Sequence, residues 1–197
     1  MDFQDVVRKR RMVRNFEERP IPPDMVERIL DNAQHSPSAG FSQGFEFLVL
    51  QSEEERQRFW AAVSPDRGWE RQGWPGVYNA PLLIVPLAHK QAYLDRYAEP
   101  DKAGARPRGE ADWQTPYWYV DTGMAALLML LTAVDARLGA LFFGLTDIPT
   151  FCTAFGVPEA YHPIGVLAIG YPLPDRPSYS LKRGRRAQAA IVHRGQW

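Results

Sequence analysis

The stretch that decides the fold is residues 120–138, VDTGMAALLMLLTAVDARL, and Gly139 ends it. Alanine, leucine and methionine are strong helix formers, and no proline interrupts them. Apolar side chains cover every side of the predicted helix between Asp121 and Asp135, so this helix belongs inside the protein or between subunits. A membrane span is excluded by length, because only 13 residues separate the two aspartates and a spanning helix needs about 20.

A short apolar run bounded by glycines, residues 139–144 (GALFFG), follows this helix and is typical of a buried strand. Similar runs predict three further strands, at residues 45–50, 82–87 and 164–170. Apolar residues at helical spacing predict helices near residues 3–10, 21–33, 53–63, 90–97 and 146–155. We expect Pro86 to place its strand near an end or edge of the sheet, and Thr146 to cap the helix that follows it. The sequence therefore predicts an α+β fold in which helices cover a mixed or antiparallel sheet.

Length and composition limit the classes of protein. A chain of 197 residues can build its own core, so residues 1–197 are predicted to form one domain. Its formal net charge is zero, which argues against a nucleic-acid binder that acts through bulk electrostatics. The single cysteine, Cys152, excludes an internal disulfide and a multi-cysteine metal site. The N-terminus is charged from Asp2 onward and lacks the apolar core of a signal peptide, which predicts a cytoplasmic location.

Three segments are irregular. Residues 99–115 are polar and contain prolines and glycines, which predicts a mobile insertion. The loop from Trp69 to Trp74 is rich in aromatic residues and suits a lid, so we expect both segments to edge a substrate pocket. Residues 172–197 begin with Pro172 and two further prolines and end with apolar residues, which predicts an extended tail that docks on another surface.

Two basic clusters lie near opposite ends of the chain. In residues 10–16 (RRMVRNF), arginines alternate with apolar side chains, so the segment can pack inward while its guanidinium groups face a ligand. Guanidinium forks match phosphate oxygens, although a solvated surface is the simpler interpretation of an arginine run taken alone. The second cluster is residues 182–186 (KRGRR). The two clusters are reasonable partners for one dianionic phosphate.

No hydrolytic or metal-binding constellation stands out in the sequence. The four histidines are scattered, and neither a P-loop nor a G-x-G-x-x-G motif is present. Residues 35–44 (HSPSAGFSQG) form a loop of small residues whose backbone amides can approach a ligand closely. Any chemistry must therefore come from a bound cofactor, or the protein has none.

Several of these segments, in this order, resemble the FMN-dependent nitroreductase family. The matching stretches are residues 10–16 with 20–22, residues 36–43, residues 121–144, residues 158–159 with 163–171, and residues 183–185. Each motif is weak alone, but together they cover nearly the whole chain in the right order. The resemblance implies an α+β homodimer with two FMN sites at the subunit interface.

The resemblance also implies which residues hold the cofactor. Arg10 and Arg14 would bind the FMN phosphate and ribityl chain, joined by Arg183 and Arg185 from the tail. The loop of residues 37–39 would approach the flavin from the second subunit. Phe143 and Gly144 would lie against the isoalloxazine, with the backbone N–H of Gly144 near N5, so no catalytic side chain is required. The implied cofactor-binding residues are Arg10, Arg11, Met12, Arg14, Pro37, Ser38, Ala39, Phe41, Gln43, Phe143, Gly144, Arg183 and Arg185.

The chain departs from the family pattern at two places. Met12 stands where relatives often have serine, which removes a hydroxyl near the phosphate. Residues 41–44 read FSQG where relatives often have Asn-x-Gln-Pro. The aromatic ring of Phe41 would therefore shield one side of the flavin site.

The resemblance implies an oxidoreductase that takes hydride from NADH or NADPH onto flavin N5 and then reduces a small organic acceptor by a ping-pong mechanism. The acceptor would be a nitroaromatic, a quinone or an enone. One alternative is a specialised, flavin-modifying member of the superfamily. Another is a non-catalytic module that grips a nucleotide, with Trp69 and Trp74 available for base stacking. We expect a small-molecule substrate and a second copy of the chain as partners, and neither nucleic acid nor a membrane.

Overall fold

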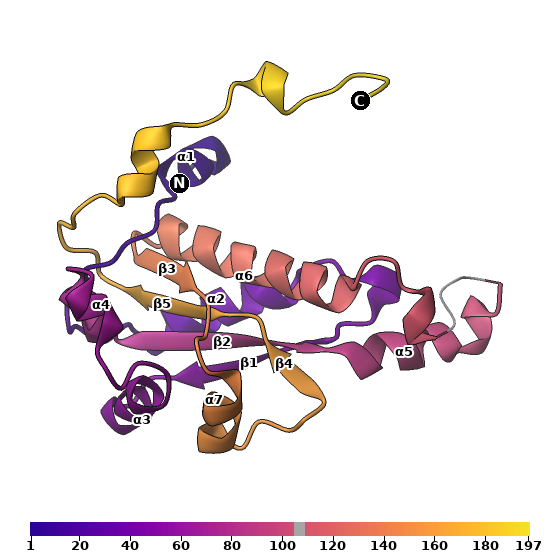
Figure 1. The fold of residues 1–197 in the computed structure, drawn as a ribbon, viewed down its shortest axis with the longest axis horizontal. Helices are drawn as coiled ribbons and strands as arrows, with labels where there is room; N and C mark the ends of the chain where they lie inside the picture. Colours follow the sequence, from indigo (N-terminus) through magenta and orange to yellow (C-terminus); the bar gives the residue numbers. More distant parts are fainter. Residues whose placement is uncertain (105–108) are drawn as a thin grey trace.

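The computed structural model describes residues 1–104 and 109–197 and contains one five-stranded sheet. The strands are β1 (Phe45–Leu50), β2 (Leu82–His89), β3 (Gly139–Phe143), β4 (Tyr161–Pro163) and β5 (Val166–Gly170). Their order is β1-β2-β5-β3, β4 pairs with β2, and every pairing is antiparallel. The predicted α+β fold with a helix-covered sheet is confirmed, and the sheet is antiparallel (Figure 1).

Helices cover both faces of this sheet. They are α1 (Phe3–Lys9), α2 (Pro23–Gln34), α3 (Glu53–Val63), α4 (Gly68–Arg71), α5 (Lys90–Ala98), α6 (Tyr117–Asp135) and α7 (Ile148–Phe155). Short 3-10 helices are η1 (Ala39–Phe41), η2 (Pro75–Asn79), η3 (Pro100–Lys102), η4 (Glu110–Asp112), η5 (Tyr179–Arg183) and η6 (Gln188–Ala190). The α2 and α6 helices pack on one face of the sheet, and α3 and α7 pack on the other.

The residues of β2 show how the sequence builds these layers. Leu82 and Ile84 belong to the core beneath α2 and α6, whereas Leu83 and Val85 belong to the core beneath α3 and α7. Successive side chains of a strand point to opposite faces, so a strand covered on both sides is apolar throughout. This explains why β2 has no polar alternation and is buried along nearly its full length.

The long helix α6 has two different apolar faces. Ala126, Met129 and Ala133 are buried with α2 and the sheet. Tyr117, Val120, Met124 and Leu127 form an exposed apolar stripe at helical spacing, and Leu127 is 47% exposed. The sequence predicts that no side of α6 faces solvent. In the single chain, the core covers one side of the helix and leaves the other side exposed. We call these four residues the α6 stripe.

The length argument about α6 was wrong. The helix begins at Tyr117, before the first aspartate, and its 19 residues are long and apolar enough to cross a membrane by length and composition alone. Half of its most apolar window is buried in the protein, and Asp121 within it is buried too. Packing, not length, identifies α6 as a core helix.

Two local predictions were also wrong. Pro86 lies inside an inner strand, because β5 pairs with Leu82–Ile84, β4 pairs with Leu87–His89, and the proline falls between these partners, where a missing N–H costs nothing. Asp147, not Thr146, caps α7, and its carboxylate accepts from the Thr150 N–H at 2.9 Å. The predicted strand at residues 164–170 corresponds to β5, and β4 is a short additional strand just before it.

The irregular segments contain more structure than predicted. The aromatic loop contains most of α4 and is followed directly by η2, and the predicted insertion at residues 99–115 includes η3 and η4. Residues 105–108 of that insertion lie outside the described residues. The tail is largely extended with two 3-10 turns, and Figure 1 shows it as an arm that leaves the sheet on the side of α1 and α6.

Candidate functional site

The first basic segment is fixed against the edge strand of the sheet. Met12 forms an isolated parallel bridge with Ala140 of β3, and the Val13 N–H donates to the Ala140 carbonyl at 3.0 Å. The Phe142 N–H points at the Met12 sulfur, 3.4 Å away. Val13 is buried and packs against Gly139, where a Cβ would stand 2.9 Å from a Val13 methyl group. Apolar residues thus anchor the segment while the arginines beside them stay outside the core.

The three arginines of this segment have different surroundings. The Arg11 guanidinium donates to Asp175 at 2.6 Å, and the Arg14 backbone N–H donates to the other oxygen of that carboxylate at 2.7 Å. The Arg14 guanidinium donates to the Met12 carbonyl at 3.3 Å. Among the described residues, neither Arg10 nor Arg14 forms an ion pair with a carboxylate. Two positive charges are therefore available to an anionic ligand at this place.

Trp74 connects the aromatic loop to the basic segment. The guanidinium groups of Arg14 and Arg176 both pack against its ring, each 5.0 Å from the ring centroid. Its indole N–H donates to the Arg176 carbonyl at 3.2 Å, and the Arg176 side chain donates to the Gln72 carbonyl at 2.7 Å. The start of the tail, from Pro172 to Arg176, is thereby held beside the arginines.

Sequence reasoning missed Asp175 and Arg176. The side chain of Asp175 is only 5% exposed, and its carboxylate orders both Arg11 and the backbone of Arg14. The available signal was one acidic residue in a tail otherwise rich in proline and arginine. That signal is weak, because an aspartate in a loop is usually a surface residue.

The second basic cluster lies on the tail. Arg183 and Arg185 are exposed there, and the neighbouring Lys182 shares a pocket with Trp74, the ring against which Arg14 packs. Arg186 bonds locally to the Ala190 carbonyl. A shared site for Arg10, Arg14, Arg183 and Arg185 stays a prediction.

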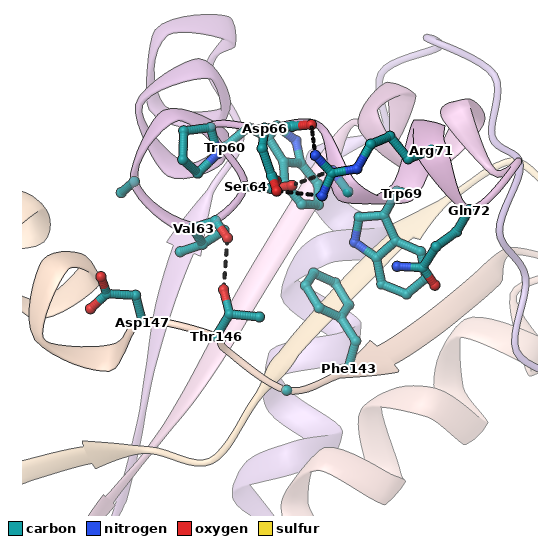
Figure 2. A pocket seen from close by; sticks show the side chains of 14 residues that line it. Trp60, Val63, Ser64, Asp66, Trp69, Arg71, Gln72, Phe143, Thr146 and Asp147 are labelled. Carbon is teal, nitrogen blue, oxygen red and sulfur yellow. Dashed lines mark hydrogen bonds and ion pairs between the residues drawn. The ribbon is translucent and has the colours of Figure 1, made fainter.

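A pocket of about 530 Å³ opens beside Phe143 and Gly144 at the end of β3 (Figure 2). The Phe143 ring stacks on Trp60, with centroids 5.9 Å apart, and meets Trp69 edge-on at 5.4 Å. The far rim carries the ion pair between Asp66 and Arg71. Both predicted residues line this pocket, and Trp69 from the predicted lid closes one side of it.

The loop with the other predicted residues lies elsewhere. Ala39 is bonded to Asp121, near the start of α6, whereas the basic segment sits beside β3, which follows the end of α6. The N-terminal ammonium bonds Asp135 at that far end. Asp121 and Asp135 are separated along the helix by 135 − 121 = 14 residues, or about 21 Å. The Ala39 loop and the basic segment of one chain thus lie near opposite ends of α6.

Two side chains with shifted pKa values, Cys152 and Tyr93, lie outside the candidate site. Burial raises the pKa of the Cys152 thiol, which keeps it protonated and a poor nucleophile. Burial and the neighbouring Asp121 carboxylate raise the pKa of Tyr93. Within the described ranges, no three His, Cys, Asp or Glu side chains are grouped so that they could hold a metal ion.

The sequence profile of the nitroreductase family matches residues 7–171, so this chain belongs to the nitroreductase family. A protein of Methanothermobacter thermautotrophicus, provisionally named NADH dehydrogenase/NAD(P)H nitroreductase, is 24% identical over 176 residues, which cover 87% of this chain and 78% of the relative. An NADPH-dependent oxidoreductase of Staphylococcus aureus is 23% identical over 175 residues, which cover 87% of this chain and 65% of the relative.

Solved structures show the same fold. A nitroreductase family protein from Clostridium difficile 630 superposes with a TM-score of 0.75 at 23% identity, and the match covers all of both chains. A provisionally named nitroreductase from Exiguobacterium sibiricum, solved in complex with FMN, superposes with a TM-score of 0.73 at 21% identity, covering 98% of this chain and 97% of that one. The resemblance seen in the sequence is therefore confirmed at the level of family and fold.

Proposed function

We propose that this protein is a homodimeric FMN-dependent oxidoreductase that takes electrons from NADH or NADPH and reduces a small organic acceptor, a nitroaromatic, quinone or enone, by a ping-pong mechanism. The observation that carries the proposal is the placement of the Arg10–Arg14 segment against β3, the strand that Gly144 follows. The names of the relatives support a nicotinamide donor, and the FMN complex of a structural neighbour supports the flavin.

The residues present fit an FMN phosphate and a flat ring. Arg10 and Arg14 have no carboxylate partner among the described residues, so a phosphate dianion can act as their anionic partner. Asp175 holds the Arg14 backbone, so that this part of the site is ordered before a ligand arrives. At Gly144 a Cβ would meet nothing within 4 Å, which leaves the backbone open to close approach. The missing serine hydroxyl at Met12 is replaced by a sulfur that faces β3.

FMN, when bound, supplies hydride acceptance at N5 and electron transfer to the acceptor. This chain's own part is binding and orientation. Arg10 and Arg14 would neutralise the phosphate, and Gly144 would offer its backbone N–H to the ring. The Phe143 ring is held by two tryptophans and would form an apolar wall rather than a movable stacking partner. Phe41, at 73% exposure, would shield a flavin bound to the second chain.

The separation of the site residues favours a homodimer. The Ala39 loop and the basic segment lie at opposite ends of α6, so neither chain alone closes a site that needs both. If two copies pack through their α6 stripes in opposite directions, the loop of each copy meets the basic segment of the other. The exposed stripe and the apolar residues of the tail, Tyr179, Leu181, Ile191, Val192 and Trp197, supply surface for such a contact.

The test is the absorbance spectrum of the purified protein, followed by anaerobic addition of NADH and of NADPH. We expect a yellow protein that releases FMN, bleaches with at least one nicotinamide and regains colour with a quinone or nitroaromatic. Initial rates over both substrates should give parallel double-reciprocal lines. A colourless protein that takes up no added FMN would overturn the proposal. Consumption of the flavin would instead indicate the flavin-modifying alternative, and retention of a nucleotide without redox activity would indicate the binding module.

A further inference from the structure

The loop that carries Ala39, Phe41 and Gln43 is held in an unusual backbone conformation. Phe41 has φ 56° and Gln43 has φ 49°, so two non-glycine residues occupy the left-handed region. This region is unfavourable for residues that carry a Cβ, and it persists where the surrounding structure enforces it. The Phe41 ring gains no burial in return, because it is 73% exposed. The loop therefore stores strain for which its own packing gives no reason.

Asp121 holds the first residue of this loop. Its side chain reaches from α6, and one carboxylate oxygen accepts from the Ala39 N–H at 2.8 Å and from the Tyr93 hydroxyl at 2.8 Å. Asp121 is 2% exposed and Tyr93 is fully buried. A buried carboxylate is unfavourable unless it is hydrogen-bonded. Here one bond goes to Ala39 of the loop, and the other goes to Tyr93 of the helix α5 beneath it.

Arg96 holds the next residue. Its Nε donates to the Gly40 carbonyl at 2.9 Å, while its terminal nitrogens form a two-pronged pair with Asp101 at 2.8 Å and a contact with Glu99 at 3.0 Å. Two consecutive loop residues are thus held by hydrogen bonds, Ala39 by the carboxylate of Asp121 from α6 and Gly40 by the guanidinium of Arg96 from α5.

Two glycines let the loop settle onto α5. A Cβ at Gly44 would stand 2.4 Å from the Tyr93 ring, and a Cβ at Gly40 would stand 2.7 Å from the Tyr97 ring. The loop backbone therefore lies directly on these rings. Rigid rings below it and charged side chains at its sides leave the loop little freedom.

We propose that Asp121 and Arg96 are positioning residues that clamp the Ala39–Gln43 loop in its strained form, so that Phe41 and Gln43 are preformed for the flavin site of the second copy. The identity of the ligand rests on the proposed function. The clamp acts before binding: it lowers the entropy that the loop would otherwise lose when it meets the cofactor. Because Arg96 also holds Asp101, the clamp links the loop to the η3 turn of the segment that follows α5.

The experiment uses the full-length variants Asp121→Asn and Arg96→Gln. Hydrogen exchange of the peptide that covers residues 38–43 reports the loop without needing a flavin, and titration of apoprotein reports FMN affinity. We expect loop exchange to become at least about tenfold faster in each variant and FMN to bind about tenfold more weakly. Asp121→Asn keeps the shape of the side chain and one acceptor oxygen, removes the charge that strengthens both bonds, and turns the second oxygen into an amide donor.

Matched controls separate positioning from general stability. Thr122→Val changes a fully buried neighbour whose hydroxyl bonds only to the Trp118 carbonyl of its own helix, at 2.6 Å. Lys90→Gln removes an exposed cation of α5 that pairs with Glu110. Both controls should leave loop exchange and FMN affinity unchanged, even where Thr122→Val lowers the melting temperature.

Unchanged loop exchange in both test variants would overturn the clamp. Equal effects in the controls would do the same, because they would indicate a purely structural role. If Asp121→Asn does not fold, Tyr93→Phe tests the same carboxylate by removing the hydroxyl that donates to it. A wild-type protein that binds no FMN would defeat the proposed function, while the exchange experiment would still decide whether the loop is clamped.

Discussion

At the scale of single residues, the neighbouring arginines of the candidate site differ in whether a carboxylate pairs with them. Arg11 is occupied by Asp175, whose carboxylate also fixes the Arg14 backbone. Arg10 and Arg14 keep their charge free of carboxylates in the described chain. A cation that is already paired in the folded protein gains less from a ligand than an unpaired one, because its pair must first be broken.

Replacement of Arg10 by alanine should weaken FMN binding at least about tenfold. A charge-assisted hydrogen bond to phosphate contributes about 1.5–3 kcal/mol, which corresponds to roughly that factor or more. Fluorescence titration of apoprotein with FMN measures it. Arg8→Ala is the control, because Arg8 is an exposed cation of α1 outside the segment. An Arg10→Ala protein with wild-type affinity would remove Arg10 from the site.

Two glycines make a second residue-level prediction. Gly44→Ala should lower the free energy of unfolding by about 1–3 kcal/mol, because its Cβ would stand 2.7 Å from the His89 carbonyl oxygen as well as against Tyr93. Gly144→Ala should leave stability nearly unchanged, since nothing described lies within 4 Å of its Cβ. Urea unfolding of both apoproteins compares them. A Gly44→Ala protein with as high a free energy of unfolding as Gly144→Ala would mean that a shift of the loop relieves the crowding at Gly44.

At the scale of elements, α6 carries both the core and the proposed interface. Its buried face is lined by small and flexible residues, Ala126, Met129 and Ala133, that pack on the sheet. The α6 stripe repeats on the opposite side at the spacing of a helical face. Such a stripe remains apolar in a folded protein when a second surface covers it, and the two ends of α6 carry complementary halves of the proposed site.

A charge in the stripe should therefore separate the subunits. Leu127→Glu should shift the protein from dimer to monomer and reduce FMN retention together, because a buried unpaired carboxylate is strongly unfavourable. Light scattering with in-line flavin absorbance measures both. Ala61→Glu adds the same charge to an exposed position of α3 and should change neither. A Leu127→Glu dimer that keeps its flavin would place the interface elsewhere.

At the scale of the whole molecule, the tail has an anchored beginning and a free end. Residues 172–176 are tied to the body through Asp175, through Arg176, and through the Asn15 side chain, which donates to the Pro174 carbonyl at 2.8 Å. From Ser178 onward the tail is almost entirely exposed and carries both Arg183 and Arg185. Anchoring at one end gives the free part a defined starting point from which to reach a second copy.

Truncation after Pro177 should separate ligand binding from folding. Exposed residues contribute little to the stability of a single chain, so the melting temperature without FMN should fall only slightly. FMN affinity should fall at least as much as in Arg10→Ala, because two predicted phosphate ligands are lost. Calorimetry and FMN titration of the truncated chain test this, with Arg183→Ala/Arg185→Ala as the matched full-length variant. An unaffected FMN affinity in both would show that the tail arginines take no part.

The sequence by itself determined the elements and the family. Periodicity and punctuation by proline and glycine place α2, α3, α6, β1 and β3 within a few residues, because these signals are local. The apolar run of α6 indicated burial, and motifs in order along the chain indicated the nitroreductase family.

Only the tertiary structure decided which face of α6 is core, since a run of apolar side chains carries no direction. It also decided that Pro86 sits between two partner strands, that Asp147 caps α7, and that Asp175 and Asp121 organise loops 161 and 82 residues away in sequence. Contacts at such separations depend on how the whole chain packs, and no local pattern encodes them.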